Sequence, residues 1–133
     1  MIEMLKIAML YVGSILIFLW GVGHLFPTKS IVEGFGNLSE DNRRIITMEW
    51  IAEGLVLCFL GLIPLFLAIF SDQSEIAFFI GNLGCVGMLI VLAILSFFTG
   101  AKTSILPMKL CPYIKLTGAT LMLLGTMMYT IPI

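Results

Sequence analysis

This sequence predicts an all-α membrane protein in which four transmembrane helices form one antiparallel bundle. Of its 133 residues, 60% are hydrophobic and only 11% are charged, and the mean hydropathy is +1.14. A soluble domain of this size is far less apolar. Four apolar runs each approach the roughly 20 residues that cross a hydrocarbon core about 30 Å thick, and they cover about residues 7–26, 45–70, 76–99 and 113–133. Residues 1–133 are therefore expected to form a single membrane domain, because no soluble domain of about 50 residues fits outside these runs.

The connection between the first two runs, residues 27–43, is long for a helical hairpin. Its apolar side chains recur at helical spacing, at Ile31, Val32, Phe35 and Leu38. This pattern predicts a short interfacial helix. Ser39 then precedes Glu40 and Asp41, which is typical of a helix N-cap followed by acids in the first turn. The helix that carries the second run is therefore expected to begin near Ser39.

Special residues in the later runs predict how the helices pack. Pro64 removes one backbone hydrogen bond from the second run and predicts a kink there. Residues 71–75 are polar and short enough for a turn between antiparallel neighbours. Glycines recur in the last two runs at Gly81, Gly84, Gly87, Gly118 and Gly125. Because small residues let helix backbones approach closely, both stripes predict helix contacts.

Basic residues near the membrane predict the orientation of the bundle. Six lie in or beside the connections between the first and second runs and between the third and fourth: Lys29, Arg43, Arg44, Lys102, Lys109 and Lys115. Only Lys6 lies on the opposite side. We therefore expect a multi-pass protein of the cell (inner, cytoplasmic) membrane, with residues 27–43 and 100–112 in the cytoplasm and both termini outside.

Two acids, Glu49 and Glu53, stand within the otherwise apolar second run. A charged side chain at the centre of a membrane helix costs roughly 2.5–3.5 kcal/mol on insertion scales. Such residues usually face the bundle interior, pair with an opposite charge, or move protons or ligands. Their spacing of four residues puts both acids on one helix face, about 6 Å apart along the axis. This stretch is the first place to look for a functional site.

Every run contributes polar or aromatic residues to the same cytoplasmic rim. His24 ends the first run, and Trp50 follows Glu49 in the second. The other candidates lie at the end of the third run and the start of the fourth: Ser96, Tyr113, Lys115 and Thr117. Glu53 is expected to pair with either His24 or Lys115.

Several of these candidates also have an ordinary interpretation. Glu49 is close enough to Arg44 along the helix to reach the lipid headgroups. Trp50 is typical of the aromatic belt at a membrane surface, and Lys115 is typical of a base that snorkels to that surface. In this interpretation Glu49 and Glu53 are purely structural.

The sequence indicates the location of such a site more clearly than it indicates the ligand. One His and two carboxylates give only a weak Glu-x-x-x-Glu pattern without the Glu-x-x-His pairs of di-iron bundles, so we expect no metal. Cys58, Cys85 and Cys111 form no C-x-x-C pair and are interpreted as packing residues. Nucleic acid is disfavoured because no basic, aromatic-bearing surface lies outside the membrane. A proton relay, or a hydrogen bond to the polar head of a quinone or lipid, requires only a desolvated acid beside a base.

In the first half of the chain, a glycine-rich helix end leads through a loop to an acid-Gly-Leu run. The residues concerned are Gly13, Ile17-Phe18, Gly21-Val22-Gly23-His24-Leu25, Gly34-Phe35 and Glu53-Gly54-Leu55-Val56-Leu57-Cys58-Phe59-Leu60-Gly61-Leu62. This half resembles the DoxX-like family of small four-helix membrane proteins. Two features depart from the family pattern, because His24 stands where a basic residue is frequent and no basic residue follows the second helix. The resemblance implies a membrane subunit or partner of a redox enzyme, similar to subunits of thiosulfate:quinone oxidoreductase, and a role for Glu53.

We therefore expect a small multi-pass membrane subunit or ligand-binding module, linked to redox chemistry through a quinone, with its polar site at the cytoplasmic rim. The alternative is a transport or assembly protein that works as an oligomer and passes a small solute, with Glu53 as a coupling carboxylate. The expected partners are the lipid bilayer, a redox enzyme or a second copy of the chain. The sequence does not decide whether the protein is an enzyme.

Overall fold

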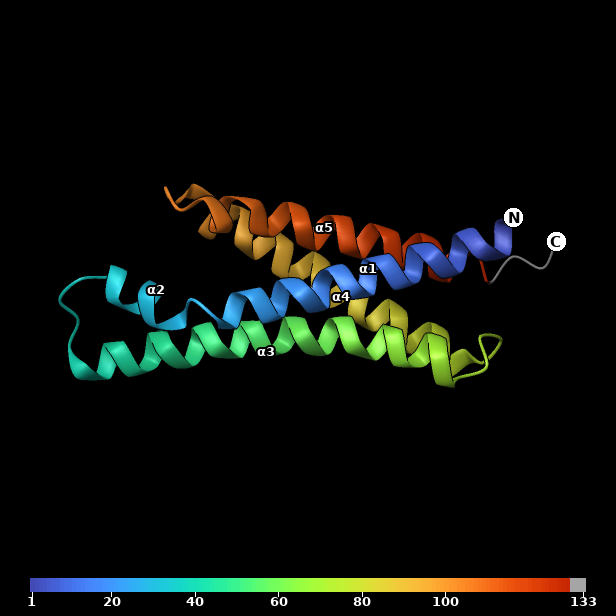
Figure 1. Ribbon diagram of the computed structural model, residues 1–133, viewed down its shortest axis with the longest axis horizontal. Coiled ribbons are helices and arrows are strands. Elements are labelled where there is room, and N and C mark those ends of the chain that lie inside the picture. Colours follow the sequence, from blue (N-terminus) through green and yellow to red (C-terminus); the bar gives the residue numbers. More distant parts are fainter. Residues whose placement is uncertain (130–133) are drawn as a thin grey trace.

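The computed structural model describes residues 1–129, with the side chains of residues 2 and 3 excepted, and every regular element in this part of the chain is a helix (Figure 1). The elements in order are α1 (Ile2–Leu25), α2 (Thr28–Gly34), α3 (Glu40–Phe70), α4 (Ile76–Phe98), the 3-10 helix η1 (Gly100–Lys102) and α5 (Leu106–Met127). Helices α1, α3, α4 and α5 are long and apolar enough to cross a membrane, and they pack together. The predicted fold class is therefore confirmed.

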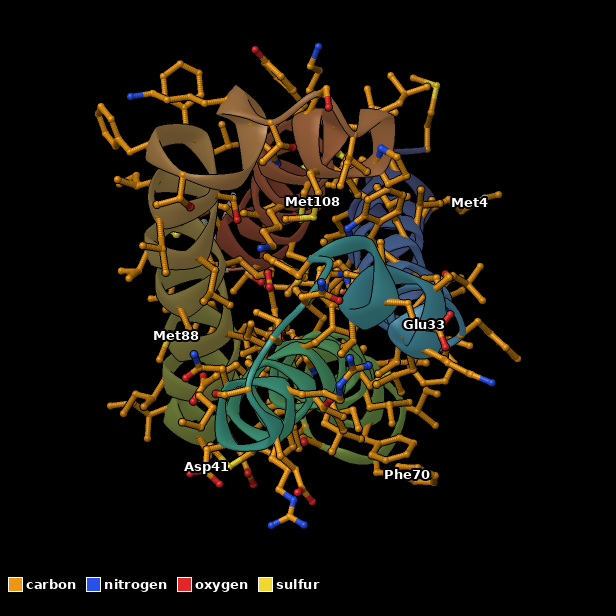
Figure 2. All side chains as sticks on the ribbon, turned by 90° about the vertical axis from the view of Figure 1, so that its left-hand side faces the viewer. Met4, Glu33, Asp41, Phe70, Met88 and Met108 are labelled. Atoms are coloured by element: carbon orange, nitrogen blue, oxygen red, sulfur yellow. The ribbon has the colours of Figure 1, made fainter. Side chains whose placement is uncertain are left out.

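The four long helices form a ring in the order α1, α3, α4, α5. Helix α1 packs against α3 and α5, and α4 packs against α5, whereas the contact between α3 and α4 is less extensive. The beginning of α1 lies at the same end of the bundle as the α3–α4 turn (Figure 1). Helix α2 and the connection between α4 and α5 lie at the opposite end, which we call the α2 end. Figure 2 looks onto the α2 end and shows α2 and the loop after it crossing the bundle.

The start of α3 follows the predicted capping pattern. The Ser39 hydroxyl accepts a hydrogen bond from the Asn42 backbone N–H at 3.2 Å, and the first turn carries Glu40 and Asp41. Glu40 also forms an ion pair with Arg44, one turn along the helix. With 31 residues, α3 is roughly 46 Å long at about 1.5 Å per residue, so it extends well beyond a hydrocarbon core of about 30 Å.

A short helix, α2, is present in the connection where an interfacial helix is predicted, and it is only seven residues long. Val32 is its buried residue and Ile31 is half-buried. Phe35 caps the C-terminal end of α2 and its side chain is exposed. The apolar face is therefore shorter than the sequence pattern suggested.

The fourth spanning helix begins earlier than predicted. Helix α5 starts at Leu106, not at residue 113, and Pro107 lies in its first turn. A proline is tolerated there because the first N–H groups of a helix have no partner within the helix. Residues 107–112 read as a loop in the sequence because they contain two prolines and a lysine. The helix ends at Met127, and residues 130–133 of the predicted run lie outside the described residues.

The glycine stripe of α5 packs against α1 as predicted. A Cβ atom on Gly125 would lie 2.8 Å from the Leu10 backbone nitrogen, and one on Gly118 would collide with the Ile17 side chain. For α4 the prediction is confirmed only at Gly81, where an added Cβ would lie 2.5 Å from the Leu67 side chain of α3. It is wrong at Gly84 and Gly87, which are exposed and have no neighbour within 4 Å of an added Cβ. The cause is the spacing. Three residues turn a helix by about 300°, so glycines three apart rotate around it, whereas seven residues return to nearly the same face.

The closest approach of a glycine to backbone atoms between α1 and α3 gives a test of this packing. A Cβ on Gly61 would lie 2.5 Å from the Phe18 backbone nitrogen and 2.7 Å from the Ser14 carbonyl oxygen. We expect Gly61→Ala to destabilise the protein by about 1–3 kcal/mol, because backbone atoms cannot move aside. Gly84→Ala is the control and is expected to be neutral or to stabilise, because alanine favours helix over glycine by about 0.8–1 kcal/mol. Thermal unfolding in mild detergent measures both variants, and equal destabilisation by the two would contradict this packing.

Candidate functional site

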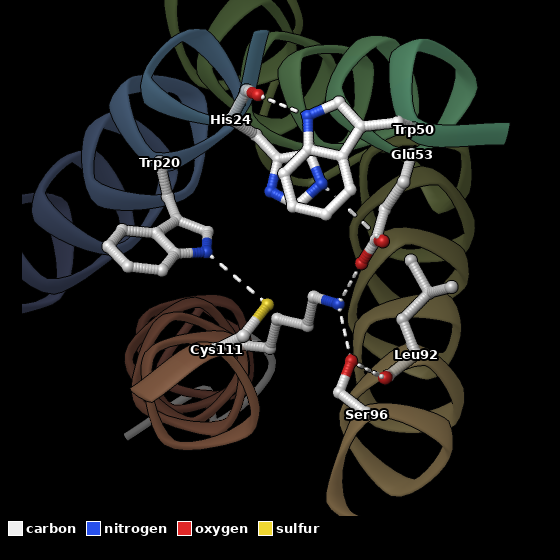
Figure 3. A network of polar contacts seen from close by, with 8 residues as sticks. Trp20, His24, Trp50, Glu53, Leu92, Ser96 and Cys111 are labelled. Atoms are coloured by element: carbon white, nitrogen blue, oxygen red, sulfur yellow. Dashed lines mark hydrogen bonds and ion pairs between the residues drawn. The ribbon is translucent and has the colours of Figure 1, made fainter. Parts of the chain in front are cut away.

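A buried ion pair joins α3 to α5 near the α2 end of the bundle. The Lys115 Nζ atom donates hydrogen bonds to Glu53 Oε1 at 2.5 Å and to Ser96 Oγ at 2.7 Å (Figure 3). Lys115 has no solvent-exposed surface, while 30% of the Glu53 side chain is exposed. Because a buried charge is costly unless it is paired and hydrogen-bonded, each of the two partners requires the other. The interpretation of Lys115 as a snorkelling base is therefore wrong.

The inward direction of Lys115 follows from its place on α5. The buried residues of this helix include Cys111, Lys115, Gly118, Met122 and Gly125. Their spacings of four, three, four and three residues mark a single helix face. Lys115 lies near the middle of that face and has to point into the bundle.

His24 and Trp50 complete what we call the Glu53 cluster: Glu53, Lys115, Ser96, His24 and Trp50. The His24 Nε2 atom lies 3.5 Å from Glu53 Oε2, within ion-pair distance but without hydrogen-bond geometry. The Trp50 ring stacks on the imidazole, with centroids 4.0 Å apart and planes at 11°. Trp50 Nε1–H also donates to the His24 carbonyl oxygen at 2.8 Å. Glu53 therefore contacts both expected partners, Lys115 through one carboxylate oxygen and His24 through the other.

Tyr113 and Thr117 do not join the cluster. Both side chains are exposed, Tyr113 by 57%, and they line a shallow surface pocket with Thr120. Each lies two residues from a position on the buried face of α5, which is about 200° around the helix. The structure therefore separates both residues from Glu53, and a ligand role for them stays a prediction.

Glu49 is exposed one turn before Glu53. It lines the same opening as Glu53 but has no ion pair among the described residues.

An aromatic cavity of about 250 Å³ adjoins the His24 side of the cluster. Its walls include Trp20, His24, Trp50, Pro107, Met108 and Cys111. Trp20 Nε1–H points at Cys111 Sγ, with the two atoms 3.5 Å apart. Figure 3 shows that one ring nitrogen of His24 faces Glu53 while the other faces the side where Trp20 and Cys111 lie. The described residues provide no hydrogen bond to that second nitrogen, His24 Nδ1.

A larger groove of about 720 Å³ lies on the Glu53 side of the cluster, between α3 and α4, which are the neighbouring pair of long helices with the least extensive contact. We call it the α3–α4 groove. Glu53 and Ser96 line it, while His24 lines only the aromatic cavity. Trp50 and Met108 line both spaces. The contact between His24 and Glu53 therefore lies between the two openings.

The sequence did not indicate Trp20, Met108 or Cys111 as site residues. Trp20 lies inside an apolar run, and Cys111 lies in the stretch of residues 107–112 that reads as a loop. Helical spacing is the signal that places both residues beside the site, because Trp20 lies four residues before His24 and Cys111 lies four residues before Lys115.

The imidazole and the carboxylate of the Glu53 cluster can exchange hydrogen bonds and protons with a bound molecule. A neutral imidazole carries one donor and one acceptor nitrogen, and a carboxylate accepts only. Among the described residues, no group of three or more His, Cys, Asp or Glu side chains gathers as a metal site.

Comparisons of this chain with models of protein families, with curated proteins and with solved structures give no match. The resemblance to the DoxX-like family therefore stays a prediction.

The Glu53–Lys115 pair can be tested by removing one charge and then both. We expect Glu53→Gln to destabilise by about 3–5 kcal/mol, because it leaves Lys115 as an unpaired buried cation. The double variant Glu53→Gln with Lys115→Met removes both charges and should recover most of that loss. Melting in mild detergent measures the two single variants, Glu53→Gln and Lys115→Met, and the double variant. A double variant that loses the sum of the two single effects would show that the two charges are energetically independent.

Proposed function

We propose that this protein is a small membrane ligand-binding subunit whose aromatic cavity holds the head of a membrane-soluble molecule against His24. A quinone is the class of ligand that we propose. Three residues act as positioning residues in this proposal, because none lines the cavity with a free polar atom. Glu53 and Trp50 contact His24, and Lys115 holds Glu53.

The observation that carries the proposal is the position of His24 between the cavity and Glu53. Its Nε2 atom is 3.5 Å from Glu53 Oε2, and its Nδ1 atom is on the side of the cavity. An imidazole nitrogen accepts a hydrogen bond when it is bare and donates one when it is protonated. It therefore matches a molecule that alternates between a carbonyl, which needs a donor, and a hydroxyl, which can use an acceptor.

The size and lining of the cavity also support a ring-shaped head group. At about 250 Å³, the cavity is slightly smaller than the roughly 300–1,000 Å³ of typical ligand pockets. A single ring fits this volume, with its apolar tail left outside in the bilayer. The walls are mainly aromatic and aliphatic, and they include two titratable side chains, the His24 imidazole and the Cys111 thiol.

A redox enzyme is the partner that the DoxX-like resemblance implies, and the α2 end is where we propose that it docks. That end carries the cavity, and its exposed residues include Lys29, Lys102 and Lys109. We propose that this end faces the cytoplasm of an inner-membrane protein. Lys6 and Lys115 are buried, so the remaining basic residues, Lys29, Arg43, Arg44, Lys102 and Lys109, all favour this orientation.

Transport of a small solute is the second candidate function. The observation that favours it is the contact between His24 and Glu53, which lies between two separate openings. In that case a proton would pass from the imidazole to the carboxylate as the solute binds. Proton-coupled flux into liposomes would favour transport over simple ligand binding.

The quinone proposal can be tested by tryptophan fluorescence, because both tryptophans of the chain line the cavity. We expect a short-chain ubiquinone analogue to quench the emission saturably. His24→Phe keeps an aromatic ring for stacking on Trp50 but removes both nitrogens, and it should weaken binding by about tenfold or more, the effect of losing a buried hydrogen bond. Glu49→Gln changes an exposed residue outside the cavity and should leave binding unchanged. Linear, unsaturable quenching that is identical in all three proteins would contradict the proposal.

The orientation can be tested by thiol labelling, with Cys58, Cys85 and Cys111 first replaced by alanine. Ser104 and Ser74 are exposed in the connections at opposite ends of the bundle. We expect Ser104→Cys to react with a membrane-impermeant maleimide only from the cytoplasmic side, and Ser74→Cys only from the outside. The reverse pattern would place the α2 end outside the cell.

A further inference from the structure

The α3–α4 groove opens sideways toward the bilayer. Helices α3 and α4 are neighbours at the turn of residues 71–75 and diverge toward the α2 end, where α4 lies against α5 (Figure 1). The walls of the groove at this end are aliphatic and include Ala52, Val56, Leu92 and Leu95. Val56 and Leu95 are also exposed on the outer surface of the bundle. An apolar chain can therefore enter the groove between the two helices without leaving the membrane.

The polar side chains of the groove have hydrogen-bond acceptors to offer but few donors. The Ser96 hydroxyl donates to the Leu92 carbonyl oxygen at 2.8 Å. The hydroxyls of Thr99 and Thr103 likewise donate to backbone carbonyls, and Trp50 Nε1–H is used by His24. Glu53 Oε2, by contrast, accepts no hydrogen bond from the described residues. A head group that binds here must supply the donor.

The charge balance of the groove disfavours charged head groups. Lys115 neutralises Glu53 at 2.5 Å but is fully buried behind it, so a molecule in the groove meets the carboxylate and not the ammonium. No Lys, Arg or His is among the described residues that line the groove, whereas Glu49 stands at its rim. A phosphate would therefore face two carboxylates with no base to pair with it. A cationic head would find Glu53 already neutralised by Lys115, and its attraction to Glu49 is weak because that carboxylate is exposed to solvent.

We propose that the α3–α4 groove binds an uncharged lipid with a free hydroxyl head, such as a diacylglycerol, taken from the bilayer. The hydroxyl donates to Glu53 Oε2, and an acyl chain lies between α3 and α4 along Val56 and Leu92. This site is separate from the aromatic cavity and does not depend on which molecule the cavity holds.

The head-group requirement can be tested on the wild-type protein alone. Native mass spectrometry in mild detergent would compare three lipids with identical chains: 1,2-dioleoylglycerol, its 3-acetyl ester and dioleoyl phosphatidic acid. We expect retention of the diacylglycerol to exceed that of the other two by about tenfold or more, because the acetyl ester has no hydrogen-bond donor for the carboxylate and the phosphate is repelled by Glu53 and Glu49. Equal retention of the acetyl ester would overturn the hydroxyl requirement. Equal or stronger retention of phosphatidic acid would overturn the choice of an uncharged head.

A matched pair of variants tests the location. Val56→Trp fills the groove with a large side chain, while Leu55→Trp places the same side chain on the adjacent lipid-exposed position, which does not line the groove. We expect diacylglycerol retention to fall about tenfold in Val56→Trp and to stay at the wild-type level in Leu55→Trp. Retention that is unchanged in both variants would place the lipid elsewhere. Because the quinone titration depends on His24 and the cavity, the two proposals can fail independently.

Discussion

The ion pair between Lys115 and Glu53 holds the structure of this bundle together at the α2 end. Taking two charges out of water is expensive, and their attraction offsets that cost only with good geometry and further hydrogen bonds. Ser96 supplies one such bond to Lys115, and His24 approaches the free carboxylate oxygen. These four side chains come from α5, α3, α4 and α1, so one buried interaction constrains all four spanning helices at the same depth.

The position of this pair also explains why the protein has two openings and not one. Glu53 is bound on one side by Lys115 and faces the α3–α4 groove with part of its surface. His24 is fixed by stacking on Trp50 and by the hydrogen bond from Trp50 to its carbonyl, so the imidazole separates Glu53 from the aromatic cavity. The cluster that stabilises the bundle therefore also places a titratable side chain at each opening: His24 at the aromatic cavity and Glu53 at the α3–α4 groove.

Packing is tight where the bundle forms its scaffold and loose where it forms the groove. Along the contacts of α1 with α3 and α5, glycines bring backbones so close that an added Cβ would meet backbone atoms within 3 Å, as at Gly61 and Gly125. No comparable contact joins α3 to α4, where Gly81 meets only the flexible end of Leu67. Close packing without bulky side chains is how membrane helices associate when lipid competes equally for their apolar surface. The weakest edge of the ring is therefore the edge that a lipid can enter.

The sequence by itself determined the fold class, because the thickness of the bilayer sets the length of every apolar run. It also determined the start of α3 through the Ser39 cap, and it identified Glu53 because an acid within such a run needs a partner. Only the tertiary structure decided which faces meet. Lys115 reads as a snorkelling base until the rotation of α5 turns it inward, and the same rotation turns Tyr113 and Thr117 outward. Gly84 and Gly118 are equally small, yet one is exposed and the other packs against α1. Helix rotation is set by the sum of many side-chain contacts between helices, and no local pattern contains that sum.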